Sequence, residues 1–196
     1  IPPIHSDQLR STPITPIPPI HSDQLRCPPI SSDPLRFLTT IMKPDDIKYI
    51  VIHCSATRSN MTYSAWQLDQ DHRARGFAMA GYHFYITRAG VIESMRPPSM
   101  PGAHAIGYNR CSLGVCYEGG LRPDGTPWDT RTPEQRAAMR KLLKALIAIH
   151  PNARIVGHRD LSPDLNHNGV IEPHEWMKAC PCFDAFKEYL SLWHKR

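Results

Sequence analysis

The 196-residue chain lacks several features that would assign it to particular classes of protein. It has no apolar run long enough for a membrane span and no charged start followed by an apolar core, so we expect neither a membrane span nor a signal peptide. It also has no long basic run and no arrayed aromatic motif, so we expect no nucleic-acid partner. The H-E-x-x-H motif is absent, which disfavours a zinc peptidase of that class.

The charge balance and the cysteines indicate which partners and which redox state to expect. Its 23 Lys and Arg and 18 Asp and Glu give a formal net charge of +5, which favours an anionic partner and serves solubility equally well. The six cysteines do not form a compact disulfide framework in a chain of this size, so we expect mostly reduced thiols. Pairing of Cys111 with Cys116 is disfavoured because a strand is expected between them.

The first 36 residues differ in composition from the rest of the chain. Residues 1–10 read I-P-P-I-H-S-D-Q-L-R, recur unchanged at 17–26, and are followed by a degenerate copy at 27–36. Many prolines and few large apolar residues predict a disordered, extended segment. It is either an adaptor-binding tail or a leader without function, and the missing initiator Met favours the leader. We therefore expect a disordered leader at 1–40 and one globular domain at 41–196.

Hydrophobic periodicity after residue 46 predicts strands interspersed with helices. Strands are expected at 47–54, 82–88, 91–95 and 112–118. Helices are expected from about 61 to 75, from 133 to 149 and from 183 to 193, the second with a capping box at its start. This order predicts an α/β fold with a mixed central β-sheet flanked by helices. The residues expected to face the core are Met139, Leu142, Leu143, Leu146 and Ile149 in the second helix and Phe186, Leu190 and Trp193 in the third.

Three residues with metal-binding side chains follow predicted strands or precede a proline. His53 ends the apolar run from residue 49, His158 follows Ile155-Val156, and Cys180 precedes Pro181. Two imidazoles and one thiolate suit zinc, and three protein ligands leave a fourth position open, as in a catalytic site. Taken singly, each residue is better explained as a satisfied histidine or a buried cysteine. Cys54 lies on the opposite strand face from His53, so we expect a buried apolar residue there.

Six segments together give the sequence a family resemblance. They are I-V-I-H-C-S-A-T (50–57), G-Y-H-F (81–84), G-A-H-A-I-G-Y-N (102–109), S-L-G-V-C (112–116), G-H-R-D (157–160) and K-A-C-P-C-F-D (178–184). In order and spacing they resemble the zinc-dependent N-acetylmuramoyl-L-alanine amidases, which include phage lysozyme-type amidases and peptidoglycan recognition proteins. The resemblance covers the chain from about residue 47 to its C-terminus. It implies one Zn²⁺ per chain, held by His53, His158 and Cys180, with Tyr82 and Lys178 as catalytic residues.

The function that the resemblance implies is peptidoglycan hydrolysis. The bond cleaved would be the amide between the lactyl group of N-acetylmuramic acid and the L-alanine of the stem peptide, as in a phage or prophage endolysin. The implied partners are peptidoglycan and muramyl peptides, and we expect a monomer that stays in the cytoplasm until its release to the cell wall. The alternative is a non-catalytic peptidoglycan-recognition module. Such relatives usually lose the cysteine ligand, whereas Cys180 is present here.

Other candidate site residues are expected near the cleft. His104 and Asn109 lie in the predicted loop at 96–110, which is long enough to shape a groove, and are candidate substrate contacts. An ordinary loop histidine is the alternative for His104. One branch of the family has a glutamate base where this chain has Cys116, so the chain resembles the phage branch, with Glu118 as a possible substitute. His83 points away from Tyr82 across the strand and is expected to be structural.

Residues 164–175 match the pattern of a calcium-binding loop, with Gly169 at the sixth position. The helix that normally precedes such a loop is missing, so the alternative is a polar turn without an ion. The candidate Ca²⁺ ligands are Asp164, Asn166, Asn168, Val170 and Glu175.

Overall fold

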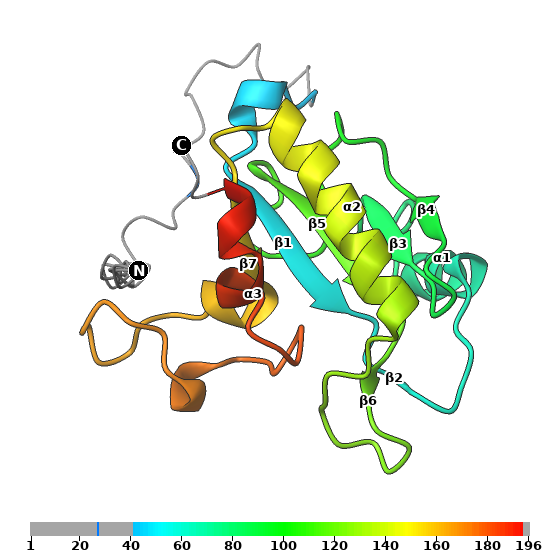
Figure 1. Cartoon of the computed structure of the whole chain (residues 1–196). Coiled ribbons are helices and arrows are strands. Elements are labelled where there is room, and N and C mark those ends of the chain that lie inside the picture. Colours follow the sequence, from blue (N-terminus) through cyan, green and yellow to red (C-terminus); the bar gives the residue numbers. More distant parts are fainter. Residues whose placement is uncertain (1–26, 28–40, 194–196) are drawn as a thin grey trace, which may run out of the picture.

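The computed structural model describes residue 27 and residues 41–193. The leader predicted at 1–40 therefore lies outside the described residues, apart from Cys27. The centre of the domain is a five-stranded sheet in the order β4-β3-β5-β1-β7, in which only the pairing of β3 with β4 is antiparallel (Figure 1). The mixed sheet predicted from the sequence is thus confirmed. Its strands are β1 (Tyr49–Cys54), β3 (Phe84–Ile86), β4 (Ile92–Ser94), β5 (Ser112–Tyr117) and β7 (Arg154–Gly157).

Three α-helices flank this sheet, namely α1 (Ala65–Ala74), α2 (Pro133–Ile149) and α3 (Ala185–Trp193). The start of α2 is as predicted, because the Thr132 hydroxyl accepts the Gln135 N–H in a capping box. Helix α1 begins later than predicted, because Ser64 caps it by accepting the Gln67 N–H at 3.2 Å. Within the described part of the chain, none of the helices combines the length and the apolar character needed to cross a membrane.

Short elements complete the fold around the sheet. Strands β2 (Thr57–Arg58) and β6 (Gly120–Leu121) pair in parallel as a separate two-stranded sheet. The described residues also form three 3₁₀-helices, namely η3 (Pro44–Asp46), η4 (His158–Leu161) and η5 (Pro173–Glu175). Helix η4 starts directly at the end of β7, so its first residue, His158, lies at the edge of the sheet.

The two faces of the sheet pack against different helices (Figure 1). On one face, α2 covers the strands, and α3 lies along β7 at the edge of the sheet. On the other face, Leu68 of α1 packs against Tyr85 and Cys116. The main core contains Ile50, Ile52, Leu113, Val115 and Ile155 from the strands and Met139, Leu142, Leu143, Leu146 and Ile147 from α2.

Two core predictions differ from the structure. Ile149 is 60% exposed, whereas Ile147 is buried. At helical spacing these two residues lie at opposite margins of the apolar stripe, and only packing on the sheet selects between them. In α3 the fully buried residues are Ala185 and Tyr189, and the predicted Phe186, Leu190 and Trp193 are half-buried.

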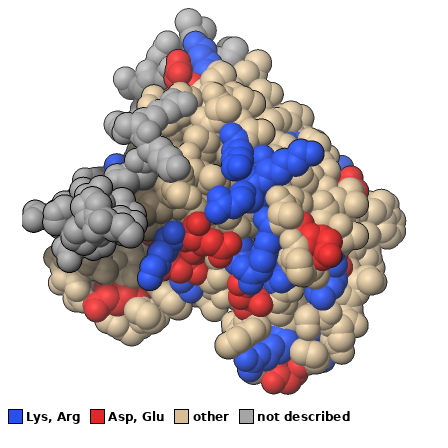
Figure 2. All heavy atoms as spheres, viewed as in Figure 1, with Lys and Arg blue, Asp and Glu red and all other residues tan. Residues whose placement is uncertain are grey.

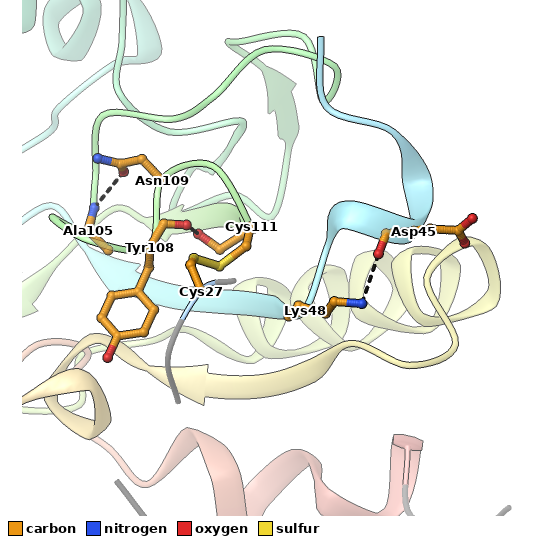
Figure 3. The surroundings of a disulfide bond; sticks show 8 residues. Cys27, Asp45, Lys48, Ala105, Tyr108, Asn109 and Cys111 are labelled. Atoms are coloured by element: carbon orange, nitrogen blue, oxygen red, sulfur yellow. Dashed lines mark hydrogen bonds between the residues drawn. A yellow bond between two sulfur atoms is a disulfide. The ribbon is translucent and has the colours of Figure 1, made fainter. Parts of the chain in front are cut away.

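One disulfide was not predicted from the sequence. Cys27 forms a disulfide with Cys111, which lies directly before β5 (Figure 3). The other four cysteines are free thiols, in line with the expectation of mostly reduced cysteines. The disulfide was missed because 84 residues separate its partners, and sequence spacing carries no information about such a distant contact.

Charges of both signs are mixed on the molecular face that carries α2 (Figure 2). Arg131 is buried and pairs with Asp129 and Glu188 at 2.8 and 2.7 Å. Arg136 of α2 pairs with the same two carboxylates at 2.6 and 3.7 Å. These ion pairs place acidic and basic groups side by side near the start of α2.

Candidate metal centre and active site

Two of the three predicted ligands are brought together by the pairing of β1 with β7. These strands are parallel neighbours, and Ile52 lies opposite Gly157. The next residues, His53 and His158, therefore leave the same edge of the sheet, where the carboxyl ends of the strands meet. Their ring centroids lie 4.6 Å apart.

The third predicted ligand, Cys180, lies in the segment before α3. Its carbonyl accepts the backbone N–H of Arg159 at 2.8 Å, which ties this segment to η4. Its sulfur accepts the backbone N–H of Cys54 at 3.3 Å and lies 3.8 Å from Nδ1 of His53. One ligand atom from each of His53, His158 and Cys180 lies within 4.8 Å of the other two.

This donor set fits a zinc ion. Zinc binds imidazole nitrogen at about 2.0 Å and thiolate sulfur at about 2.3 Å, so a tetrahedral site separates the two atoms by about 3.5 Å. The 3.8 Å between His53 Nδ1 and Cys180 Sγ is close to this separation. Two nitrogens and one sulfur are also ligand types that zinc accepts.

Burial keeps both histidines in the form that can bind a metal. It lowers the pKa of His53 well below its ordinary value, and the neighbouring His104, His158 and Lys178 lower it further. Burial also lowers the pKa of His158 to about 4, with a further contribution from the charge of Lys178. Both imidazoles are therefore neutral near pH 7, and neutral imidazole is the metal-binding form.

The two predicted catalytic residues flank this group. The ring of Tyr82 lies 5.0 Å from the ring of His53, centroid to centroid. Burial raises the pKa of Tyr82 well above its ordinary value, and the nearby sulfurs of Cys116 and Cys180 raise it further. The phenol is therefore protonated near neutral pH and can donate its proton. Lys178 is exposed, yet its charge is close enough to lower the pKa of both histidines.

The candidate substrate contacts, His104 and Asn109, have partners inside the protein. His104 Nδ1 lies 3.0 Å from His53 Nε2, and its Nε2 is buried without a partner in the described structure. The side-chain oxygen of Asn109 accepts the backbone N–H groups of His104 and Ala105 at 2.8 and 2.9 Å, the second of which appears in Figure 3. Asn109 thus shapes the loop that carries His104, and His104 contacts the candidate metal ligand His53.

The carboxylate of Glu118 holds the backbone in place instead of standing free to act as a base. Its two carboxylate oxygens accept the backbone N–H groups of Tyr63 at 2.6 Å and Arg88 at 2.8 Å. Cys116, where a related branch has its glutamate, is fully buried and pairs in register with His53. His83 is buried as well, accepting the Gly114 N–H at Nδ1 and donating from Nε2 to the Met100 carbonyl.

The predicted calcium loop is closed by its own hydrogen bonds. The Asp164 carboxylate accepts the backbone N–H groups of Asn168 and Gly169 at 3.2 and 2.7 Å. The Glu175 carboxylate accepts three more, from Leu165, Asn166 and Glu172. These amides satisfy the two carboxylates without a cation, so calcium binding stays a prediction.

Sequence reasoning missed two contacts beside the ligands. One is the approach of His104 to His53, for which the 51-residue separation offered no signal. The other joins Cys54 and Cys182, whose sulfurs lie 3.9 Å apart. Cys54 itself is buried in the main core, as expected for an apolar residue.

Comparison with known proteins identifies the family. The sequence profile described as N-acetylmuramoyl-L-alanine amidase matches residues 43–182. The endolysin of Enterobacteria phage K11 is 36% identical over 142 residues, covering 72% of this chain and 85% of that protein. A peptidoglycan-recognition protein of Drosophila melanogaster is 31% identical over 121 residues, covering 57% of this chain and 63% of that protein.

A solved structure agrees with this result. It is the endolysin N-acetylmuramoyl-L-alanine amidase LysCS from Clostridium intestinale, with a TM-score of 0.59 and 25% identity, covering 78% of this chain and 87% of that one. The profile match spans well over half of the chain and includes all three residues of the metal centre. The chain therefore belongs to the N-acetylmuramoyl-L-alanine amidase family.

Proposed function

We propose that the protein is a zinc-dependent peptidoglycan hydrolase. It cleaves the amide bond between the lactyl group of N-acetylmuramic acid and the L-alanine of the stem peptide. The observation that carries this proposal is the convergence of His53, His158 and Cys180 on one point, in a chain of the amidase family. Three ligands of these types leave a fourth zinc position for reaction, which distinguishes a catalytic from a structural site.

The roles of the neighbouring residues follow from their charge and position. When bound, zinc polarises the scissile carbonyl group and allows water to act as a nucleophile at neutral pH. Tyr82, whose ring lies 5.0 Å from that of His53, orients the nucleophile, and its phenol relays to the leaving amine the proton that the attacking water releases. The ammonium group of Lys178 stabilises the negative charge that develops on the carbonyl oxygen.

The proposal extends to partner, location and assembly. The protein acts on peptidoglycan and its muramyl peptides, after release to the cell wall, as an endolysin does. A single chain supplies all three ligands as well as Tyr82 and Lys178, so the proposed enzyme works as a monomer.

The rival function is a binding module that recognises muramyl peptides without cleaving them. Similarity to a peptidoglycan-recognition protein keeps this function in view, but the presence of the complete ligand set, Cys180 included, favours the enzyme.

One experiment separates the two functions. The full chain, with zinc content measured, is incubated with a defined muramyl peptide, and free L-alanine amino termini are quantified. The enzyme releases them with about one zinc per chain, loses activity in a chelator and regains it when zinc is restored. Binding of the peptide at full zinc content without new amino termini would overturn the proposal in favour of the binding module.

A further inference from the structure

We propose that His104 is a positioning residue of the metal centre. Its Nδ1 accepts a hydrogen bond from Nε2–H of His53 and so keeps the Nδ1 lone pair of His53 directed at the metal. This inference rests on the proposed zinc site and assigns His104 a role different from the substrate contact expected from the sequence.

The two ring nitrogens of His53 face different partners. Nδ1 faces the sulfur of Cys180 at 3.8 Å, which is the side on which the ligand atoms converge. Nε2 faces His104 Nδ1 at 3.0 Å. A metal at Nδ1 requires a lone pair there, so the ring proton must be on Nε2. His104 Nδ1 is then the acceptor for that proton, in the arrangement that orients metal-binding histidines in proteins.

The space for His104 is provided by two glycines. A Cβ atom at Gly114 would stand 2.6 Å from Cδ2 of the His104 ring, and a Cβ atom at Gly102 would also collide with this ring. Because neither glycine has a side chain, the imidazole fits between them, while Asn109 holds the backbone of His104 from the loop side. The ring therefore has little freedom to turn away from His53.

The surroundings of His104 disfavour a direct contact with substrate. Its Nδ1 is engaged by His53, and its Nε2 is buried and lacks a partner among the described residues. The ring also interacts with the backbone carbonyl of Ser112. The hydrogen bond to His53 is the contact that would serve the metal.

A matched pair of variants tests this role. In His104→Asn the side-chain oxygen takes nearly the place of Nδ1 and preserves the acceptor, whereas His104→Leu has a similar shape without it. Zinc affinity is measured by competition with a chromophoric chelator, and the melting temperature is measured on the zinc-free proteins. We expect roughly 10- to 100-fold weaker zinc binding in His104→Leu and a loss of only a few fold in His104→Asn.

The outcomes distinguish positioning from other roles. Wild-type zinc affinity in His104→Leu would overturn the proposal. Equal losses in both variants would also overturn it, because they would show that filling the space between the glycines is what matters. Failure of the wild-type protein to bind zinc refutes the proposed function itself, before any variant is compared.

A second measurement needs no substitution and applies even if His104→Leu does not fold. Long-range proton–nitrogen correlation spectra of the zinc-loaded wild-type protein report which nitrogen of each imidazole carries the proton. We expect the proton of His53 on Nε2, and Nδ1 of His104 unprotonated. A proton on Nδ1 of His104 would contradict the proposal.

Discussion

The backbone N–H of Cys54 donates a hydrogen bond to the sulfur of Cys180, at 3.3 Å. Cys54 directly follows the proposed ligand His53 in β1, so this bond places two proposed ligands from distant parts of the chain relative to each other. The end of β1 thus supplies one ligand and supports another.

The first prediction concerns these ligands. Cys180→Ser and His158→Ala should each lose zinc and amidase activity, because two remaining protein ligands do not hold an open catalytic ion tightly. Zinc per chain after gel filtration and hydrolysis of a muramyl peptide are the two measurements. Cys182→Ser is a matched control, since its sulfur contacts Cys54 rather than the ligand group, and it should keep zinc. Full activity in zinc-free Cys180→Ser would refute the mechanism.

A second prediction separates chemistry from binding. Tyr82→Phe and Lys178→Ala should each lower kcat by roughly a hundredfold or more while zinc content and substrate affinity stay near wild type. The reason is that the phenol proton and the ammonium charge act on groups that become charged only during the reaction. Steady-state kinetics on a defined muramyl peptide give kcat and KM separately. A loss confined to KM would make these residues substrate contacts.

The third prediction concerns Glu118. Its carboxylate holds the backbone amides of Tyr63 and Arg88, so Glu118→Gln, which keeps one acceptor oxygen, should lower the free energy of unfolding by about 1–3 kcal/mol. Turnover well below the melting temperature should be unchanged. Denaturant unfolding and the amidase assay measure the two effects. A large drop in kcat at unchanged stability would show that Glu118 acts as the base that a related branch of the family has at the position of Cys116.

The disulfide between Cys27 and Cys111 leads to a fourth prediction. It closes a loop with a sequence separation of 84 residues, so Cys27→Ser should destabilise the oxidised protein, by at most about 4.6 kcal/mol on the loop-entropy estimate. Thermal unfolding without reductant measures the change, and thiol counting of the unfolded wild type should find four free cysteines. Six free thiols, or identical melting temperatures, would contradict the bond.

The fifth prediction is that the loop at 164–175 binds calcium weakly, in the range of extracellular modules. Calcium should raise the melting temperature of the wild type through the linkage of binding to folding. Asp164→Ala and Glu175→Gln remove carboxylate oxygens and should abolish that rise, although both variants will also lose hydrogen bonds inside the loop. Differential scanning calorimetry with and without millimolar calcium provides the comparison. An unchanged wild-type melting temperature would reduce the loop to a polar turn.

Local patterns in the sequence were sufficient for much of the fold. The α2 helix begins where its capping box predicts, and β1, β5 and the β3–β4 pair lie where alternation predicts strands. These signals are local because a cap or an alternating strand depends on a few neighbouring residues. The burial of residues at the edges of a helix's apolar stripe was predicted less well, as the exposed Ile149 shows.

The sequence by itself determined the family and the candidate ligands, because His53, His158 and Cys180 stand in segments that match the family in order and chemistry. Tertiary structure alone decided what surrounds them. The register of β1 with β7 places the two histidines together. The His104 ring packs against Gly102 and Gly114, and this packing brings it to His53. The same holds for the disulfide from Cys27 to Cys111. Contacts between segments tens of residues apart arise from how strands and loops pack, and no local pattern of residues encodes them.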